Sequence, residues 1–290
     1  MKIAIASGKG GAGKTSLAVN LASYVANVIG TLPFERVTLV DLDVEEPNSG
    51  LFLNMQMLEK ENIKRYVPEY SEINCTLCGK CKEVCNFNAI ALLPKNILVF
   101  PDLCHSCFAC SELCPTGSLG MVEKLTGTIS RFIEGSFDFF EARLEIGEPS
   151  AVPLIKGAHN FLKSYQSRNG LYIYDCPPGT SCSVIESVKE ADLVVLVAEA
   201  TPFGFHDFKL ALETMESIQK EYVVVINKAT GDYHEIEEYC TRKNCEIIAR
   251  IPFVREVSEL YSIGKIFIDS VIPLREEIAR MVTRLSARNV

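Results

Sequence analysis

The sequence predicts a doubly wound α/β fold with a mostly parallel sheet in a three-layer arrangement, interrupted by a small α+β insert. Short segments recur that are apolar continuously rather than in alternation, as in strands covered on both faces. Helical stretches lie between these segments, and this alternation is typical of a parallel sheet. Eight of the 12 cysteines lie within residues 75–114, which marks the insert.

Length and charge restrict the class of protein. A chain of 290 residues can form one large domain and a small one. The net charge of −8 and pI of about 5.2 argue against a nucleic-acid partner. No apolar run approaches the roughly 18 residues of a membrane span, and the start MKIAIASGKGG is too short and glycine-rich for a signal peptide. We therefore expect a cytoplasmic protein with reduced thiols and no membrane partner.

The elements follow in order. We expect strands at 2–7, 37–41, 171–175, 193–198, 222–226 and 246–251, and helices at 15–26 and 208–218. Residues 127–148 partly alternate and predict an antiparallel hairpin. In the segment 273–290, an apolar stripe at helical spacing is typical of a helix that faces the core rather than a membrane: Leu274, Ile278, Met281 and Leu285.

The periodic pattern breaks between residues 66 and 122, where turn residues and the cysteine motifs gather. We interpret 66–122 as a domain inserted between the second and third predicted parallel strands. Residues 1–65 and 123–290 then form one discontinuous α/β domain of ordinary size.

The cysteines repeat one spacing, C-x-x-C-x-x-C-x-x-x-C, in two copies separated by 18 residues: Cys75, Cys78, Cys81 and Cys85, then Cys104, Cys107, Cys110 and Cys114. Three thiolates at this spacing can bind one face of an iron–sulfur cubane. The alternative is structural zinc. Zinc usually takes two ligands from each of two separated segments, and a third close cysteine has no role there.

This pattern resembles that of bacterial two-cluster ferredoxins, in which the last cysteine of each motif binds the other cluster. The resemblance implies two [4Fe–4S] clusters. Cluster 1 would be held by Cys75, Cys78, Cys81 and Cys114, and cluster 2 by Cys85, Cys104, Cys107 and Cys110. Asn86 stands where the pattern usually has proline, so the turn after the first motif is in question.

A phosphate-binding loop follows the first strand. The residues Gly8-Lys9-Gly10-Gly11-Ala12-Gly13-Lys14-Thr15 fit G-x-x-x-x-G-K-[ST] and lead into a helix that continues with Ser16. Backbone N–H groups of such a loop surround phosphate oxygens, and the helix adds its positive N-terminal end. Lys14 would bind the β- and γ-phosphates, and the Thr15 hydroxyl would bind Mg²⁺.

Lys9 makes this loop resemble the P-loop ATPases of the MinD/ParA/Mrp group, which includes the nitrogenase iron protein. The resemblance covers most of the chain outside the insert. It implies an ATP-dependent homodimer in which Lys9 reaches the partner's nucleotide. It also implies ATP with Mg²⁺ as the bound nucleotide.

Two aspartate segments match the switch regions of this family. The sequence VDLD ends the second strand, where Asp43 resembles the residue that orients the attacking water and Asp41 lies nearer the Mg²⁺. The sequence DCPPG resembles the second switch, in which Asp175 would hold Mg²⁺ through water. The implied catalytic residues are Lys9, Lys14, Asp43 and Asp175, and the implied magnesium residues are Thr15, Asp41 and Asp175.

The base is expected against Asn227 and Lys228, where this family contacts it. GTPases carry N-K-x-D there, and the fourth position of this chain is Thr230 instead. Without that carboxylate guanine loses its main contact, so we expect adenine. We expect Pro252 to pack near the base as well, although it could also simply end a strand.

The combination resembles MinD-type ATPases with an inserted ferredoxin domain. We expect a slow ATPase that couples ATP-driven dimerisation to electron transfer with an unidentified redox protein. One alternative is an iron–sulfur cluster carrier of the Mrp kind. The other is a MinD/ParA-like spatial regulator with structural or sensory clusters.

Overall fold

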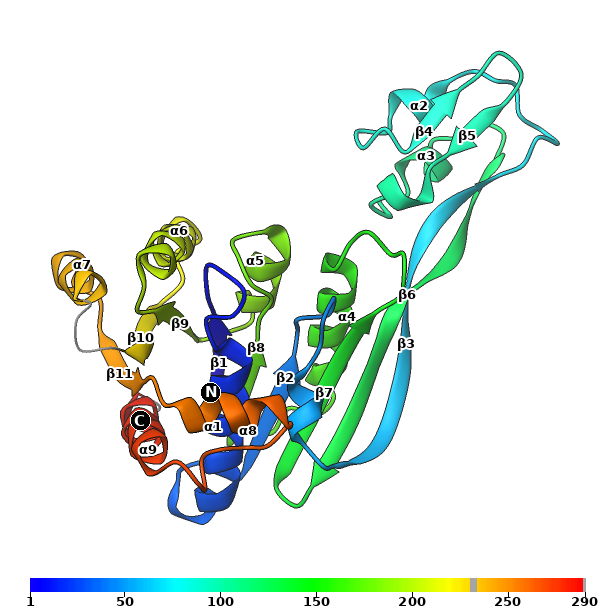
Figure 1. The fold of residues 1–290 in the computed structure, drawn as a ribbon. Coiled ribbons are helices and arrows are strands. Elements are labelled where there is room, and N and C mark those ends of the chain that lie inside the picture. The colour runs from blue at the N-terminus through cyan, green and yellow to red at the C-terminus, as the bar shows by residue number, and fades with distance from the viewer. Residues whose placement is uncertain (230–233, 289–290) are drawn as a thin grey trace. The chain divides into compact units, whose positions relative to one another are not determined.

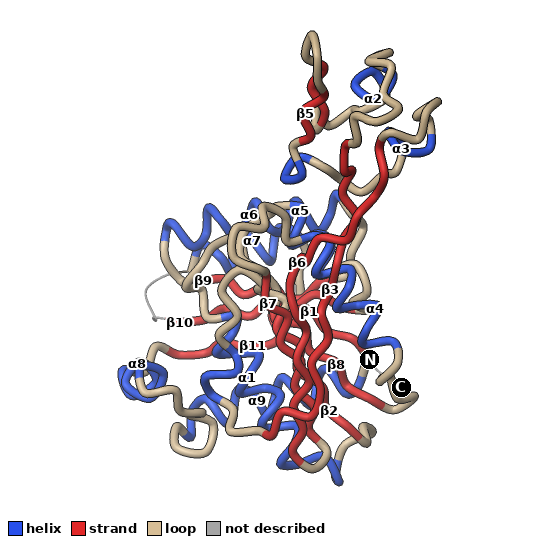
Figure 2. The backbone as a smooth tube through the Cα atoms, turned by 90° about the vertical axis from the view of Figure 1, so that its right-hand side faces the viewer, coloured by secondary structure: helices blue, strands red, loops and turns tan. Residues whose placement is uncertain are grey.

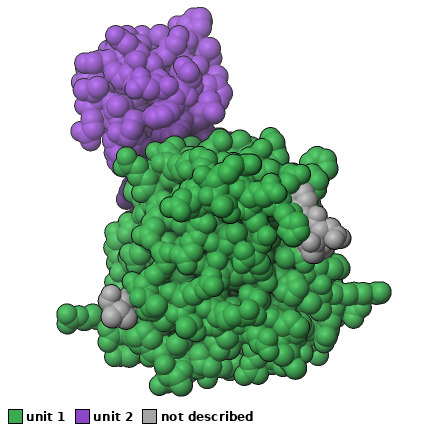
Figure 3. All heavy atoms as spheres, turned by 90° about the vertical axis from the view of Figure 1, so that its left-hand side faces the viewer, with its two compact units in different colours: residues 1–61, 129–143, 155–290 green, residues 62–128, 144–154 purple. Residues whose placement is uncertain are grey.

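The computed structural model describes residues 1–229 and 234–288. It divides into two compact units, coloured separately in Figure 3. The first unit comprises Met1–Glu61, Ile129–Arg143 and Ile155–Val290, and the second comprises Asn62–Thr128 and Leu144–Leu154. The second unit thus takes in a segment, Leu144–Leu154, that the sequence analysis assigned to the α/β domain.

All six predicted parallel strands are present. They are β1 (Lys2–Ala6), β2 (Arg36–Asp41), β8 (Gly170–Asp175), β9 (Leu193–Glu199), β10 (Tyr222–Ala229) and β11 (Ile247–Pro252). Their ends agree with the predicted ends within one or two residues, except that β10 extends further at its C-terminal end. Among the described residues, one nine-stranded sheet has the order β11-β10-β9-β1-β8-β2-β7-β6-β3. Strand β1 pairs in parallel with β8 and β9, and β8 pairs in parallel with β2. The strands are the red segments of Figure 2.

Three further strands complete this sheet: β3 (Gln56–Tyr70), β6 (Leu119–Glu134) and β7 (Phe137–Leu144). Strands β6 and β7 are sheet neighbours joined by the two residues Gly135 and Ser136, which confirms the predicted hairpin. The sequence analysis missed β3. Its first seven residues, 56–62, are all exposed and mostly polar, so they carry no apolar alternation.

Helices cover both faces of the sheet in the first unit (Figure 1). One face is covered by α1 (Lys14–Val28), α8 (Arg255–Ser262) and α9 (Ile272–Ala287). Apolar residues of α1 and α9 share a buried cluster with alternate residues of the strands, and the partly buried Val257 and Leu260 of α8 pack against this cluster. The other face carries α4 (Val152–Lys163), α5 (Cys182–Val188), α6 (Pro202–Ser217) and α7 (Glu235–Lys243). Short 3₁₀ helices occupy Ile29–Thr31 and Ser49–Phe52.

The C-terminal stripe faces the core, as predicted, because Leu274, Ile278, Met281 and Leu285 are each at most 3% exposed. A search of the described residues for a helix long and apolar enough to cross a membrane finds none.

The second unit is a small α+β structure. It contains α2 (Lys80–Glu83), α3 (Ala109–Glu112), the antiparallel pair β4 (Ile90–Leu92) and β5 (Ile97–Val99), a 3₁₀ helix at Pro101–Leu103, and parts of β3 and β6. Its core consists of Cys81, Ile90, Ile97, Cys110 and Leu119.

Candidate nucleotide site and cysteine cavities

The phosphate loop connects β1 to α1 at the carboxyl edge of the sheet. Gly11 and Gly13 have φ of 75° and 95°, a left-handed conformation that glycine adopts without strain. Gly8 is required for a different reason: a Cβ there would lie 1.9 Å from the backbone oxygen of Asp207 in α6. The sequence pattern therefore reflects both backbone conformation and the close packing of α6. Lys14 begins α1 and is only 6% exposed.

A cavity of about 420 Å³ opens beside this loop within the first unit. Its lining combines polar groups of the loop, Asp43 and Asn48 with the apolar residues Pro252 and Phe253 and with residues of α8. This combination is suited to a ligand with a charged end and a flat apolar end. Its lining includes Gly10, Gly11, Gly13, Lys14, Thr15, Ser16, Asn227, Lys228, Ile251, Val257 and Tyr261.

Asn227 and Lys228 support the loop from β10. The Asn227 side-chain amide donates to the carbonyl of Ala12 at 2.8 Å, and Lys228 Nζ donates to the carbonyl of Gly11 at 3.0 Å. Both residues also line the cavity. Their contact with a base stays a prediction. Thr230, on which the expectation of adenine rested, lies outside the described residues.

Glu199, at the end of β9, pairs with both lysines that flank the loop. It forms an ion pair with Lys9 and another, 3.0 Å long, with Lys228. Burial raises the pKa of Glu199, but the hydrogen bonds from these two lysines outweigh it and hold the pKa below its usual value. In this chain Lys9 is thus engaged within its own subunit. Sequence reasoning missed Glu199, because no motif includes it.

Asp41 and Asp175 end adjacent strands and lie opposite each other in the β2–β8 register. Both are fully buried. The carboxylate of Asp41 accepts the backbone N–H groups of Asp43 at 3.1 Å, Asn48 at 3.0 Å and Ser49 at 2.9 Å, so it shapes the loop after β2. Asp175 Oδ2 accepts the Ser49 hydroxyl at 3.2 Å.

Asp175 keeps one oxygen without a hydrogen-bond partner in the structure, Oδ1, and this oxygen is buried. Burial raises its pKa to about 6, while a hydrogen bond with Thr15 and the charge of Lys14 act in the opposite direction. Burial and the charge of Asp175 together raise the pKa of Asp41 well above its usual range. Two buried carboxylates and a threonine hydroxyl beside a phosphate loop fit Mg²⁺, a cation that prefers oxygen ligands.

Asp43 lies on the wall of the cavity and is half-buried. Burial raises its pKa to about 6, against the effect of Lys14. A carboxylate in this position can accept a proton from a water molecule in the cavity at neutral pH.

The second unit holds the eight motif cysteines around two small cavities. One cavity is lined by Cys75, Cys78, Cys81 and Cys114. The other is lined by Cys85, Cys104, Cys107 and Cys110. The structure therefore groups the last cysteine of each motif with the first three of the other.

The two motifs have matching backbone conformations. Leu77 and Ser106 have φ of 53° and 54°, and the amide N–H of each donates to the Sγ two residues earlier at 3.4 Å. Asn88 and Gly117 also match, with φ of 53° and 67°. The turn after the first motif therefore forms with Asn86 in place of proline.

These cavities fit iron–sulfur clusters in their donor set. Each offers four thiols, and N–H groups directed at sulfur favour the thiolate form. Among the described residues, no three His, Cys, Asp or Glu side chains lie close enough to hold a single metal ion. A cluster does not need such closeness, because each of its iron atoms takes a different thiolate.

Comparisons with known proteins agree with this architecture. A family model described as the CobQ/CobB/MinD/ParA nucleotide binding domain matches residues 3–268. An uncharacterized protein of Methanocaldococcus jannaschii, MJ0578, is 31% identical over 287 residues, which is 98% of this chain and 96% of that protein. A ferredoxin of Alicyclobacillus acidocaldarius is 35% identical over 63 residues, which is 22% of this chain and 81% of the ferredoxin.

Solved structures show the same fold. The MinD cell division protein of Aquifex aeolicus aligns with a TM-score of 0.58 at 18% identity, over 99% of this chain and 97% of that one. The septum site-determining protein MinD of Pyrococcus horikoshii, complexed with Mg-ADP, aligns with a TM-score of 0.60 at 13% identity, over 98% and 95%.

Proposed function

Because this chain belongs to the CobQ/CobB/MinD/ParA nucleotide-binding family, we propose that it is an ATPase with two [4Fe–4S] clusters. It binds Mg-ATP, hydrolyses it slowly and couples ATP-driven dimerisation to electron transfer with a redox partner. The observation that carries the proposal is the presence in one chain of both sites: a phosphate loop beside two buried aspartates, and two cavities of four cysteines each. Either site alone occurs in proteins of many functions.

The roles at the nucleotide site follow from position. Lys14 begins α1 beside the loop and binds the terminal phosphates. Thr15, Asp175 and Asp41 would hold Mg²⁺, and Asp41 also shapes the loop that follows β2. Asp43, on the cavity wall, orients the attacking water and takes its proton.

Lys9 has a different role. In the dimer it leaves Glu199 and binds the nucleotide of the partner subunit, as the resemblance to this family implies. The exchange of one anionic partner for another limits the net gain, because the contact with Glu199 is lost. Through Lys9, ATP therefore favours the dimer only to the extent that Lys9 binds the γ-phosphate more tightly than it binds Glu199.

In the second unit, the clusters would supply one-electron redox chemistry. The residues that would hold them are the two sets of four cysteines, one set for each cavity. Cys78 and Cys107 are exposed, one in each set, so each cavity reaches the protein surface. Such exposure suits electron exchange with another protein.

The first test is the composition of protein purified without oxygen. We expect about eight iron and eight acid-labile sulfide atoms per chain, from two cubanes. Stoichiometric zinc without sulfide and without charge-transfer absorbance would refute the cluster assignment. Transfer of iron to an apo-acceptor, with no redox response to nucleotide, would favour the cluster-carrier alternative. Intact clusters whose potentials and electron-transfer rates ignore nucleotide would favour the spatial regulator.

The second test concerns the nucleotide. Calorimetry should show Mg-ATP bound in preference to Mg-GTP. Lys14→Ala should abolish binding, whereas Asp43→Ala should retain binding and lose turnover, because it removes only the water-orienting group. Equal affinity for the two nucleotides would contradict the proposed adenine site. Retained turnover in Asp43→Ala would contradict the role of Asp43.

A further inference from the structure

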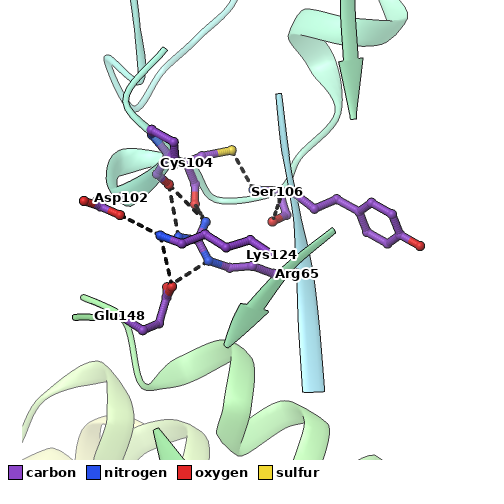
Figure 4. Close-up of polar contacts among 8 residues, drawn as sticks. Arg65, Asp102, Cys104, Ser106, Lys124 and Glu148 are labelled. Atoms are coloured by element: carbon purple, nitrogen blue, oxygen red, sulfur yellow. Dashed lines mark hydrogen bonds and ion pairs between the residues drawn. The ribbon is translucent and has the colours of Figure 1, made fainter. Parts of the chain in front are cut away.

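Arg65 of β3 is a buried cation in the second unit. Its side chain is 5% exposed, and its Nε donates to Glu148 Oε1 at 2.8 Å (Figure 4). The Glu148 side chain is 1% exposed. Breaking such a buried pair would leave a charge without compensation, which is costly. Arg65 is therefore held firmly in one position.

The rest of the Arg65 guanidinium is directed at the second cysteine motif. Its Nη1 donates to the carbonyl of Cys104 at 3.0 Å, and both Nη1 and Nη2 donate to the carbonyl of Pro101 at 3.1 Å. Cys104 lines the second cysteine cavity. Arg65 thus places a positive charge on the backbone of one of the four residues assigned to cluster 2.

Other charges complete the group around Arg65. Lys124 Nζ lies 2.8 Å from Asp102 Oδ1 and 3.4 Å from Glu148 Oε2 (Figure 4). The group therefore contains two cations and two anions. Only Arg65 among them donates a hydrogen bond to a motif cysteine, so its charge is the one in contact with the motif.

Among the described residues, the first motif has no equivalent buried cation: Lys80 lines the first cysteine cavity, but it is exposed to water, which screens its charge. Cys75 occupies the position that Cys104 has in the second motif, and its side-chain partner is the neutral hydroxyl of Tyr70. In the part of the chain that the structure describes, no lysine or arginine side chain donates a hydrogen bond to residues 75–85. The two motifs match in backbone conformation but differ in the charge beside them.

We propose that Arg65 is a positioning residue that makes cluster 2 easier to reduce than cluster 1. This inference rests on the proposed function, since it requires both clusters. Reduction adds one electron from an external donor, and no bond forms or breaks. A cation in a weakly polar interior stabilises the added negative charge, and net charge and hydrogen bonding are among the factors that set cluster potentials. Electrons entering the second unit would then collect at the cavity lined by Cys104.

The test is a redox titration of the purified holoprotein, with reduction by dithionite followed by electron paramagnetic resonance. Wild type should show two separate one-electron steps. Arg65→Gln removes the charge but keeps an amide donor. It should make the easier step at least tenfold less favourable, which is about 59 mV for one electron, and leave the other step nearly unchanged.

Two further variants separate charge from structure. Glu148→Gln leaves Arg65 without its compensating anion and should shift the same step in the opposite direction. Arg65→Lys keeps the charge and should stay closer to wild type than Arg65→Gln. If Arg65 had a merely structural role, Arg65→Gln and Glu148→Gln would not shift the reduction potential in opposite directions.

Lys64→Gln is the matched control. It makes the same charge change at the neighbouring position of β3, but the Lys64 side chain is 48% exposed and pairs with Glu123. It should shift neither step, because water screens an exposed charge.

The outcomes distinguish this inference from the proposed function. Suppose that the protein holds eight irons per chain but Arg65→Gln shifts neither reduction step, or shifts both equally. This result would overturn the inference and leave the assignment of two clusters intact. A shift in the same direction from Arg65→Gln and Glu148→Gln would overturn it as well. Zinc in place of iron would overturn both.

Discussion

Asp175 combines full burial with an oxygen that has no hydrogen-bond partner in the structure. Such a group destabilises the nucleotide-free protein, because an ionised carboxylate loses its hydration there. The family to which the chain belongs binds nucleotide at this place, and a cation would supply the missing partner. We therefore expect Asp175 to reduce stability when the site is empty and to increase it when Mg-ATP is bound.

The pH dependence of this effect follows from the raised pKa of Asp175. Its pKa is about 6 in the folded protein and 3.8 in the unfolded chain. Between these values the folded state binds more protons, so the free energy of unfolding falls as pH rises from about 4 to about 6. Asp175→Asn should remove this loss of stability, because asparagine does not titrate.

The variant should therefore melt above wild type at pH 7.5 without magnesium or nucleotide, and the difference should shrink at pH 5. Mg-ATP should raise the melting temperature of wild type much more than that of the variant. Glu45→Gln, at an exposed carboxylate near the same loop, should show neither effect. A variant that melts below wild type at pH 7.5 would contradict this account.

Residues such as Asp175 and Lys14 could be predicted because a motif fixes their position in the chain. Ser49, Glu199 and Arg65 could not be predicted in this way. Ser49 contacts Asp175 across 126 positions of sequence, and Arg65 contacts Glu148 across 83. No local pattern records such pairings, since they depend on which strands become neighbours.

At the scale of elements, the packing of α6 against the phosphate loop decides how the loop is built. The backbone of Asp207 in α6 leaves no space for a side chain at Gly8, whereas a Cβ at Gly10 would meet nothing within 4 Å. Two glycines of one motif therefore have different reasons to be glycine.

This difference gives a matched pair of variants. Gly8→Ala should destabilise the protein by about 1–3 kcal/mol, as overpacking against fixed backbone typically does, and should weaken ATP binding. Gly10→Ala should unfold at the wild-type midpoint. Urea denaturation followed by circular dichroism measures both. Equal midpoints for the two variants would show that α6 moves aside at little cost.

The parallel strands could be predicted from sequence because strands buried on both faces leave continuous apolar runs. The hairpin of β6 and β7 could also be predicted, since part of it alternates. Strand β3 could not, because residues 56–62 are exposed and mostly polar. Its place in the sheet comes from backbone pairing, which leaves no signature in side chains.

At the scale of the whole molecule, the proposed role of Lys9 connects the nucleotide site to assembly. In the Asp43→Ala background, which should hold ATP without hydrolysing it, Mg-ATP should produce a dimer by light scattering. Adding Lys9→Ala should weaken this dimer at least tenfold, because each subunit loses a charge-assisted contact worth about 1.5–3 kcal/mol, of which the Lys9–Glu199 pair of the monomer offsets only a part.

Lys189→Ala is the control for this experiment. The Lys189 side chain is 61% exposed and, among the residues that the structure describes, forms an ion pair only with Glu186, three positions away on the chain. Dimerisation should survive its loss. If the Lys9→Ala protein dimerises as well as its parent, the crossing of Lys9 between subunits is wrong.

The sheet order has a consequence for the growing chain on the ribosome. All eight cysteines of the two cavities have been made once the chain reaches residue 114. Strand β8, which lies between β1 and β2 and carries Asp175, follows more than 50 residues later. The cavity beside the phosphate loop is complete only when Ile278 of α9 is in place. Synthesis thus finishes the thiol sites first, the paired aspartates second and the nucleotide cavity last, so the proposed clusters would have their ligands on a nascent chain well before the proposed ATP site is complete.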